Sequence, residues 1–266
     1  MVYVDCKSYA QEILDKVKAA PNKKALWILS MGDNPASESY IKGKIKDCEY
    51  CGIPYLHYKA KDIRDLWDWI DKGNYNSDVA GIIIPLPLPP EAEGFNLTEQ
   101  INPAKDVDGL GSKSFYKPCT PEAILYLLRK ELGDLTGMTA LVMGRGKLVG
   151  KPVAQMLLDA DCTVTVAHSK SKLYSNLFLH QDIIVSAIGK PKSTDLDYCY
   201  NADIVVDAGV SRDANGKLCG DCYNFELTED GEDGWLPKVT PVPNGIGLLT
   251  RAMLMAHIAR VDVWEE

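Results

Sequence analysis

In the first third of the chain, segments with apolar residues at every third or fourth position alternate with short, mostly apolar segments. Residues 4–17 and 63–73 repeat apolar side chains every three or four positions, which predicts two amphipathic helices, the second ended by Gly73. Shorter apolar segments between them predict strands at residues 25–29, 55–58 and 79–84. The last of these is almost continuously apolar, as in a strand buried on both faces of a parallel sheet, and the prolines after it stop strand pairing. The alternation predicts a parallel α/β domain.

The second half of the chain repeats this alternation. Strands are predicted at residues 139–143, 163–167, 182–187 and 203–207, and Asn215-Gly216 predicts a tight hairpin turn. Before them, Thr120 and Pro121 are residues that cap and open a helix, so we expect a domain boundary there. The pattern therefore predicts two α/β domains.

The charge and hydrophobic content of the chain argue against nucleic-acid and membrane partners. The chain has 266 residues, of which 46% are hydrophobic and 25% charged, with a formal net charge of −8. This balance disfavours a nucleic-acid partner, because no basic block is present to displace phosphate counterions. No apolar run reaches membrane-spanning length and the start does not resemble a signal peptide, so a cytoplasmic protein without membrane contact is expected.

Eight cysteines include two Cys-x-x-Cys pairs, Cys48/Cys51 and Cys219/Cys222. The pairs are far apart in sequence, whereas zinc sites usually place theirs within about 20 residues of each other. We expect reduced cysteines that act as small apolar residues, with a shared metal site as the alternative.

Residues 33–52 predict a helix that carries candidate chemistry. Asn34 suits the N-cap, Pro35 suits the first helical position, and Gly52 is a natural stop. Tyr40 and Lys44 are one turn apart on this helix. A phenol beside an amine can hold a small substrate, and an amine shielded from water releases its proton more readily. The alternative is a solvated lysine beside a half-buried tyrosine.

A glycine-rich turn follows the strand at 139–143. The sequence Gly144-Arg145-Gly146-Lys147-Leu148-Val149-Gly150 leads into a helix, the setting in which backbone N–H groups receive a diphosphate. An ordinary tight connection is the alternative. NAD-specific sites usually carry Asp or Glu after the next strand, but His168-Ser169-Lys170 stands there. Arg145, Ser169 and Lys170 would instead accept a 2′-phosphate, which favours NADP.

With these blocks in order, the chain resembles the bifunctional methylenetetrahydrofolate dehydrogenase/methenyltetrahydrofolate cyclohydrolase family. The first domain carries Gly32-Asp33-Asn34-Pro35-Ala36-Ser37 with Tyr40 and Lys44, Pro87-Leu88-Pro89, Lys105-Asp106-Val107-Asp108-Gly109 and Pro118-Cys119-Thr120-Pro121. The second carries Gly144-Arg145 through Val149-Gly150-Lys151-Pro152, Ala167-His168-Ser169, Ser186-Ala187-Ile188-Gly189-Lys190-Pro191, Asp207-Ala208-Gly209 and Thr240-Pro241-Val242-Pro243. The matches run almost from end to end.

The resemblance implies an N-terminal α/β substrate domain and a Rossmann-type NADP-binding domain with a cleft between them. The implied ranges are 1–121 with 246–266, and 122–245. It also implies a homodimer formed through the second domain, tetrahydrofolate derivatives as substrates, and a place in purine biosynthesis. The implied substrate-binding residues are Tyr40, Lys44, Pro87, Leu88, Asp108, Pro243, Gly245 and Gly247. The implied cofactor-binding residues are Gly144, Arg145, Gly146, Val149, Gly150, Lys151, His168, Ser169, Lys170, Ala187, Gly189, Asp207, Gly209 and Thr240.

The implied reaction has two steps. Hydride leaves the folate methylene carbon for the nicotinamide, and water then attacks the resulting methenyl cation. Lys44 is the expected general acid/base of the second step, with Tyr40 stacked on the ring system. Asp108 is the expected acceptor for the pterin N–H groups and Asp106 the second choice. The alternative role for both aspartates is loop capping.

The chain departs from the family pattern at several positions. Pro85 stands where the family usually has a Gln that can hold the lysine and order water, and proline has no side-chain donor. The loop between Gly109 and Pro118 is shorter than usual. Gly146 replaces a Ser, Leu248 replaces a Pro, and Asn244 replaces a Gly but can adopt a left-handed conformation.

These departures define the rival functions. Loss of the Gln favours a monofunctional dehydrogenase with weak or absent cyclohydrolase activity. A catalytically idle folate- or nucleotide-binding protein is a rival from another class, and the retained Lys44 argues against it.

Overall fold

The computed structural model describes residues 2–92, 94–172, 177–224 and 237–264. The chain divides into two compact units. The cofactor unit comprises Met1–Tyr9 and Thr120–Thr250, and the lysine unit comprises Ala10–Cys119 and Arg251–Glu266. The ranges expected from the sequence stay a prediction. They differ from these units chiefly in the first nine residues, which join the cofactor unit.

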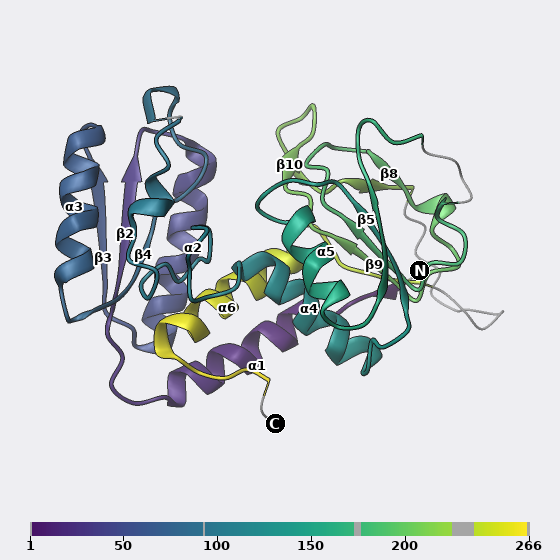
Figure 1. The fold of residues 1–266 in the computed structure, drawn as a ribbon, viewed down its shortest axis with the longest axis horizontal. Helices are drawn as coiled ribbons and strands as arrows, with labels where there is room; N and C mark the ends of the chain where they lie inside the picture. Colours follow the sequence, from purple (N-terminus) through teal and green to yellow (C-terminus); the bar gives the residue numbers. More distant parts are fainter. Residues whose placement is uncertain (1, 93, 173–176, 225–236, 265–266) are drawn as a thin grey trace. The chain divides into compact units, whose positions relative to one another are not determined.

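The lysine unit is built on a three-stranded parallel sheet. Its strands are β2 (Ala25–Met31), β3 (Tyr55–Ala60) and β4 (Val79–Ile83), in the order β3-β2-β4. Helix α3 (Ile63–Tyr75) covers one face, where Leu66 and Ile70 pack into the apolar core with residues of β2 and β4 (Figure 1). Two short 3₁₀ turns, Pro90–Ala92 and Leu97–Gln100, follow β4.

Helix α2 (Pro35–Cys51) lies on the side of this sheet opposite to α3 (Figure 1). It begins at Pro35 as predicted, and it ends before Gly52, which has a φ of 65°. The N–H of Ile53 donates to the carbonyl of Cys48, which closes the last turn. Helix α1 (Cys6–Ala19) contacts α2 through Tyr50, whose hydroxyl donates to Asp15. Helix α6 (Ile246–Ala259) belongs to this unit from Arg251 onward.

The cofactor unit is built on a six-stranded, all-parallel sheet. Its strands are β1 (Val2–Tyr3), β13 (Lys238–Val239), β9 (Ile204–Asp207), β7 (Ile183–Ser186), β5 (Thr139–Met143) and β6 (Thr163–Ala167), in that spatial order. Helices α4 (Cys119–Leu132) and α5 (Gly150–Leu158) complete the unit. The strand order reverses at β5, where an open α/β sheet places its ligand crevice.

Short pairings lie beside this sheet. β8 (Thr194–Asp195) pairs with β12 (Cys222–Tyr223). The 3₁₀ turn Leu196–Tyr198 directly follows β8 in the sequence. β10 (Ser211–Arg212) and β11 (Leu218–Cys219) form the antiparallel hairpin predicted at Asn215-Gly216, and Gly216 has a φ of 77°.

The predictions for β5 and β6 are confirmed residue by residue, and the other predicted strand ranges differ from the structure by one or two residues at an end. Three further predictions are wrong. The first helix begins at Cys6, because Val2 and Tyr3 pair with β13 as strand β1. Helix α4 begins at Cys119, so Thr120 is not its cap. Gly73 lies inside α3, where a Cβ would come 2.7 Å from Ile82 Cδ1. Close packing against β4 explains that glycine, and the helix ends after Tyr75.

Candidate active site

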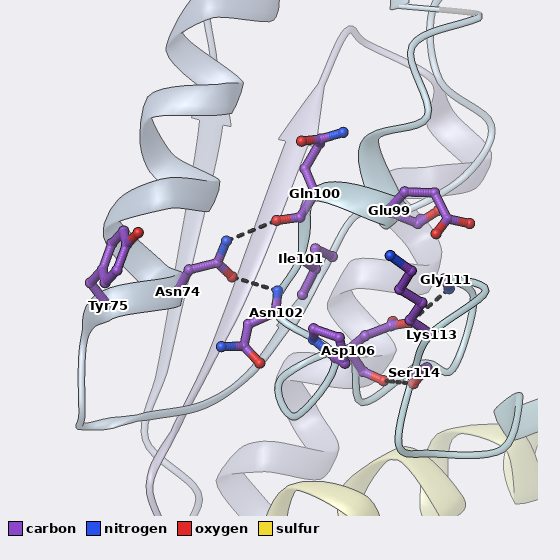
Figure 2. A pocket seen from close by; sticks show the side chains of 12 residues that line it. Asn74, Tyr75, Glu99, Gln100, Ile101, Asn102, Asp106, Gly111, Lys113 and Ser114 are labelled. Carbon is purple, nitrogen blue, oxygen red and sulfur yellow. Dashed lines mark hydrogen bonds between the residues drawn. The ribbon is translucent and has the colours of Figure 1, made fainter.

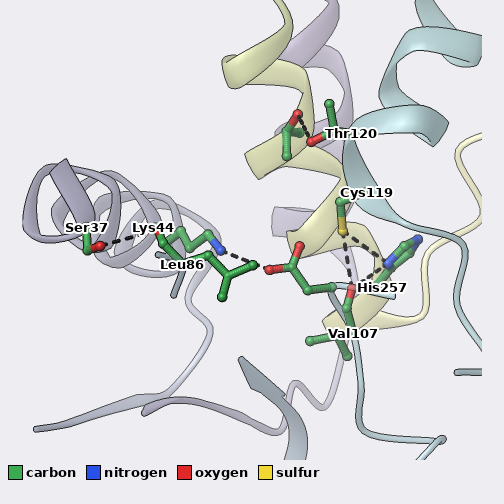
Figure 3. A network of polar contacts seen from close by, with 9 residues as sticks. Ser37, Lys44, Leu86, Val107, Cys119, Thr120 and His257 are labelled. Carbon is green, nitrogen blue, oxygen red and sulfur yellow. Dashed lines mark hydrogen bonds and ion pairs between the residues drawn. The ribbon is translucent and has the colours of Figure 1, made fainter. Parts of the chain in front are cut away.

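Lys44 forms a buried ion pair with Asp108 in the lysine unit. Only 5% of the Lys44 surface is exposed, and its Nζ donates to Asp108 Oδ2 at 3.3 Å (Figure 3). Lysine is rarely buried in proteins unless its charge is paired. The ring of Tyr40, one turn earlier on α2, has its centroid 5.8 Å from the same nitrogen, within cation–π range. The structure thus brings together the three residues that we expected to act on one substrate.

The phenol of Tyr40 stays protonated at neutral pH. Burial raises its pKa from 10.0, and the charge of Lys44 opposes part of that rise. The residue as a whole remains 38% exposed. Tyr40 therefore offers a neutral hydroxyl and an accessible aromatic face, which suits stacking against a flat heterocycle.

Asp106 accepts hydrogen bonds from within its own loop. Its Oδ2 accepts from the N–H of Gly111 at 2.7 Å, and Ser114 Oγ donates to its carbonyl at 2.9 Å. Burial raises the pKa of this carboxyl above 3.8, although the loop N–H groups oppose the shift. The alternative of loop capping therefore describes Asp106, while Asp108 pairs with the amine.

A cavity of about 420 Å³ lies on the Asp106 side of this loop (Figure 2). Residues 74–75, 98–103, 106, 111 and 113–114 line it, and neither Lys44 nor Asp108 does. The cavity is therefore separate from the amine–carboxylate pair.

The chain around Asp108 is fixed by close backbone contacts. Gly109 has a φ of 70°, and a Cβ there would come 2.3 Å from the carbonyl oxygen of Lys117. The carbonyl of Asp108 accepts from the N–H of Cys119 at 3.2 Å. Val107 packs on Gly81 of β4, where a Cβ would meet Val107 Cγ2 at 2.5 Å. The Lys-Asp-Val-Asp-Gly turn thus holds the Asp108 carboxylate at a defined place.

The proline-rich segment after β4 carries the predicted substrate residues Pro87 and Leu88. Ser37 Oγ on α2 donates to the carbonyl of Leu86 at 3.3 Å (Figure 3). Leu88 packs against the apolar core of the unit and Pro87 is exposed. The segment is thereby tied to the helix that carries Lys44.

The glycine-rich turn in the cofactor unit needs two of its three glycines. Gly144 has a φ of 110°, and a Cβ there would come 2.2 Å from the carbonyl oxygen of Ala187 after β7. A Cβ at Gly150 would come 2.3 Å from the carbonyl oxygen of Gly144, whereas nothing lies within 4 Å of one at Gly146. Val149, the N-cap residue of α5, has no side chain that could accept from the first N–H groups of the helix. N–H groups at such a helix start suit a phosphate.

Three polar side chains suited to a 2′-phosphate lie at the ends of neighbouring strands. Met143 of β5 is registered with Ala167 of β6, and the N–H of Gly144 donates to the carbonyl of Ala167 at 2.8 Å. Arg145 and Ser169-Lys170 directly follow those strand ends and are exposed, while His168 Nδ1 accepts from the N–H of Lys170. Lys151 lies in the first turn of α5 and is also exposed. These residues fit the phosphates of NADP.

Two buried carboxylates, Asp207 and Asp221, shape the loops that follow β7 and β9. Asp221 accepts from the N–H groups of Ile188, Gly189 and Lys190 at 2.7–3.0 Å. Asp207 accepts from the N–H groups of Gly209, Asp221 and Cys222. Burial raises the pKa of Asp207, and its carboxylate accepts from backbone N–H groups of the same unit. Sequence reasoning missed Asp221, for which an isolated acid next to Gly220 was the only signal.

The remaining predicted residues also lie in the cofactor unit. Thr240 is 2% exposed, and its Oγ1 accepts from the N–H of Asp207 at 2.8 Å. Pro243, Gly245 and Gly247 lie where α6 begins, and a Cβ at Gly245 would come 2.0 Å from the carbonyl oxygen of Pro241. The predicted substrate residues are thus divided between the two units.

The cysteine pairs do not combine into a metal site among the described residues. No group of three or more His, Cys, Asp or Glu residues there could hold an ion. Burial raises the pKa of Cys48 to about 12 and that of Cys51 to about 11, so both thiols stay protonated on α2. Among the described helices, none combines the length and apolarity needed to cross a membrane.

Comparison with protein families matches both parts of the chain. Residues 4–108 match the model "Tetrahydrofolate dehydrogenase/cyclohydrolase, catalytic domain", and residues 118–264 match the model "Tetrahydrofolate dehydrogenase/cyclohydrolase, NAD(P)-binding domain". The first match contains Lys44 and Asp108, and the second contains the glycine-rich turn.

Relatives and solved structures resemble the chain over nearly its whole length. The bifunctional protein FolD of Lachnoclostridium phytofermentans is 37% identical, with 95% of this chain and 94% of that protein covered. The bifunctional enzyme FolD of Campylobacter jejuni has a TM-score of 0.88 at 33% identity, covering 97% and 96% of the two chains. A Trypanosoma brucei dehydrogenase-cyclohydrolase complexed with NADP and an inhibitor has a TM-score of 0.84 at 27% identity, covering 97% and 95%.

Proposed function

The chain belongs to the tetrahydrofolate dehydrogenase/cyclohydrolase family, and we propose from this premise that the Lys44–Asp108 pair moves protons in its hydrolytic reaction. The protein is an NADP-dependent enzyme that oxidises methylenetetrahydrofolate to methenyltetrahydrofolate and hydrolyses the product to formyltetrahydrofolate. The observation that carries the proposal is the Lys44 amine, which is almost fully buried with Asp108 as its ion-pair partner.

The cofactor unit holds the hydride acceptor. Gly144 and Gly150 let the backbone approach a diphosphate, and Arg145, Ser169 and Lys170 receive the 2′-phosphate. NADP, when bound, supplies the carbon that accepts the hydride. The oxidation moves no proton from the folate, so the protein contributes to it chiefly by holding the two reactants in place.

Hydrolysis, in contrast, needs proton transfer. Water adds to the cationic methenyl carbon and loses both of its protons. One proton reaches the ring nitrogen as the bond between that nitrogen and the carbon breaks, and the other leaves to solvent. Lys44 can accept and return the transferred proton, because its amine is shielded from bulk water and held at one position by Asp108.

Asp108 and Tyr40 orient the substrate in this proposal. The second oxygen of Asp108 can accept from pterin N–H groups while Oδ2 holds Lys44. The exposed face of Tyr40 stacks on the ring system, beside the tied segment of Pro87 and Leu88.

The monofunctional alternative rests on Pro85 alone and is not favoured, because the similar curated relatives are named bifunctional proteins. Separate assays of hydride transfer and methenyl hydrolysis test it. We expect both activities in the purified protein, and hydrolysis at the uncatalysed rate would contradict the proposal. Pro85→Gln should raise hydrolysis relative to hydride transfer, because it adds an amide that can order water.

We further propose a homodimer, formed through the cofactor unit, that works in the cytoplasm and supplies formyl groups to purine biosynthesis. The family resemblance supports this assembly, and eight free cysteines are compatible with a reducing compartment. Light scattering of the protein as it elutes from a size-exclusion column should give twice the chain mass of 29.3 kDa. A monomer at micromolar concentration would contradict the dimer.

A further inference from the structure

Helix α6 contacts both elements that carry the ion pair. Arg251, in its second turn, donates through Nε to Asp47 Oδ2 at 2.6 Å and through Nη2 to Asp47 Oδ1 at 3.4 Å. Asp47 is 6% exposed and lies three residues after Lys44 on α2. A forked contact between a guanidinium and a buried carboxylate fixes both position and orientation.

Gly43 makes this contact possible. An ideal Cβ at Gly43 would lie 2.7 Å from Arg251 Nη1 and 3.1 Å from Cζ. The guanidinium therefore lies against the backbone of α2 at the residue that precedes Lys44. Glycine weakens a helix interior, so the close approach gives a physical reason for a glycine at this position.

His257, near the end of α6, holds the other partner. Its Nδ1 lies 2.8 Å from the carbonyl oxygen of Val107 and donates to it (Figure 3). The centroid of its ring lies 4.8 Å from that of the Tyr116 ring. The same carbonyl accepts from Cys119 Sγ at 3.3 Å. Val107 immediately precedes Asp108, so this hydrogen bond restricts the backbone from which the carboxylate projects.

We propose that helix α6 sets the separation of Lys44 and Asp108, with Arg251 and His257 as positioning residues for the hydrolytic step. This inference rests on the proposed function of the ion pair. Arg251 fixes the helix that carries the amine, and His257 fixes the loop that carries the carboxylate. Proton transfer requires the amine within hydrogen-bond reach of its target, whereas hydride transfer requires only that the folate be bound.

Three variants test the inference in the full-length enzyme. Arg251→Met removes the fork and keeps the apolar stem, and His257→Phe removes the donor and keeps the ring beside Tyr116. Gly43→Ala leaves every charge in place and displaces the guanidinium with one methyl group. Arg260→Met, the same substitution at an exposed arginine just beyond α6, is the matched control.

We expect kcat for methenyl hydrolysis to fall about tenfold in Arg251→Met and His257→Phe, and about threefold in Gly43→Ala. The kcat for hydride transfer and the KM for folate should stay within about twofold of wild type in all three, and the pH profile of hydrolysis should shift. Arg260→Met should leave every parameter unchanged. Because Gly43→Ala raises helix propensity, it remains informative if either of the other variants fails to fold.

Hydrolysis within twofold of wild type in all folded variants would overturn the inference. A parallel fall of both activities together with the melting temperature would also overturn it, because that result indicates a structural role only. Lys44→Met in the same assays distinguishes a failure of the proposed function of Lys44 from a failure of the positioning role of α6. If it retains hydrolysis, the proposed function itself fails, and if it alone loses hydrolysis, only the role of α6 fails.

Discussion

At the scale of single residues, the two aspartates of one short turn do different work. Asp108 points to the amine of Lys44 at 3.3 Å, whereas Asp106 turns to the N–H of Gly111 at 2.7 Å. One carboxylate thereby pairs with the amine, and the other maintains the loop. The shape of the loop gives the two carboxylates different partners, although only Val107 separates them.

Asp108→Asn should impair the substrate site without unfolding the protein. The amide keeps the shape of the side chain but loses the charge that holds Lys44 and attracts pterin N–H groups. We expect kcat/KM for hydrolysis to fall about 10- to 100-fold, the scale of a hydrogen bond to a charged group. Steady-state assays at several folate concentrations measure it, and a change below twofold would contradict the role of Asp108.

The sequence predicted the neighbour of Lys44 on its own helix better than its partner on the loop. Tyr40 and Lys44 share a helix whose cap, proline and final glycine are all readable, so their proximity followed from helical spacing. Choosing between Asp106 and Asp108 needed the direction of each side chain, which depends on the shape of the loop to Gly111. Spacing alone contains no such information.

At the scale of elements, the cofactor unit gathers its polar residues at the carboxyl ends of β6, β5, β7 and β9. The glycine-rich turn packs against Ala187, and Asp221 draws three consecutive N–H groups of the neighbouring loop around one carboxylate. No helix or strand partner satisfies those N–H groups. The shape of the loop that follows β7 therefore depends on one buried acid.

Asp221→Asn should weaken both stability and NADP binding. The amide nitrogen cannot accept hydrogen bonds, so at least one loop N–H loses its acceptor at a cost of about 1–3 kcal/mol. We expect a lower urea midpoint and a several-fold higher KM for NADP, with the KM for folate unchanged.

Asp213→Asn is the control for this change. Asp213 also accepts two backbone N–H groups, but in the exposed β10–β11 hairpin. Its loss should change stability by no more than about 0.5 kcal/mol. Equal effects of the two substitutions on the KM for NADP would contradict the role given to Asp221.

Element boundaries were predictable where turn residues flanked them and uncertain elsewhere. The ranges of β5 and β6 were correct because glycine and polar turns surround an apolar core strand. Strand β1 was missed because two exposed residues carry no period, and its pairing with β13 joins positions more than 230 residues apart. Gly73 was misread because a glycine packed against Ile82 and Trp27 looks the same in sequence as a helix stop.

At the scale of the whole molecule, burial changes how tightly three carboxyl groups bind protons. Burial raises the pKa of Asp47, Asp106 and Asp207 above 3.8. A raised carboxyl pKa means that the folded state binds the proton more tightly than the unfolded state does. Its contribution to stability is therefore present below pH 3.8 and declines as pH rises through the folded-state pKa.

Asp106→Asn should isolate the pH-dependent contribution of the Asp106 carboxyl to stability, because the amide oxygen can still accept from the N–H of Gly111. Relative to wild type, the free energy of unfolding of the variant should increase as pH rises from 3.8 and become constant above the folded-state pKa. Urea titrations across this range measure the difference. A difference that decreases with rising pH would show that the ionised form of Asp106 stabilises the fold.

The central claim is that the buried amine of Lys44 moves the proton in methenyl hydrolysis, and Lys44→Met tests it most directly. Methionine fills the apolar part of the lysine site, and Lys42→Met, on the same helix at an exposed position, controls for the substitution. We expect hydrolysis to fall by about 10²- to 10⁴-fold in Lys44→Met while NADP reduction stays measurable, with both activities intact in Lys42→Met. Wild-type hydrolysis by Lys44→Met would contradict it.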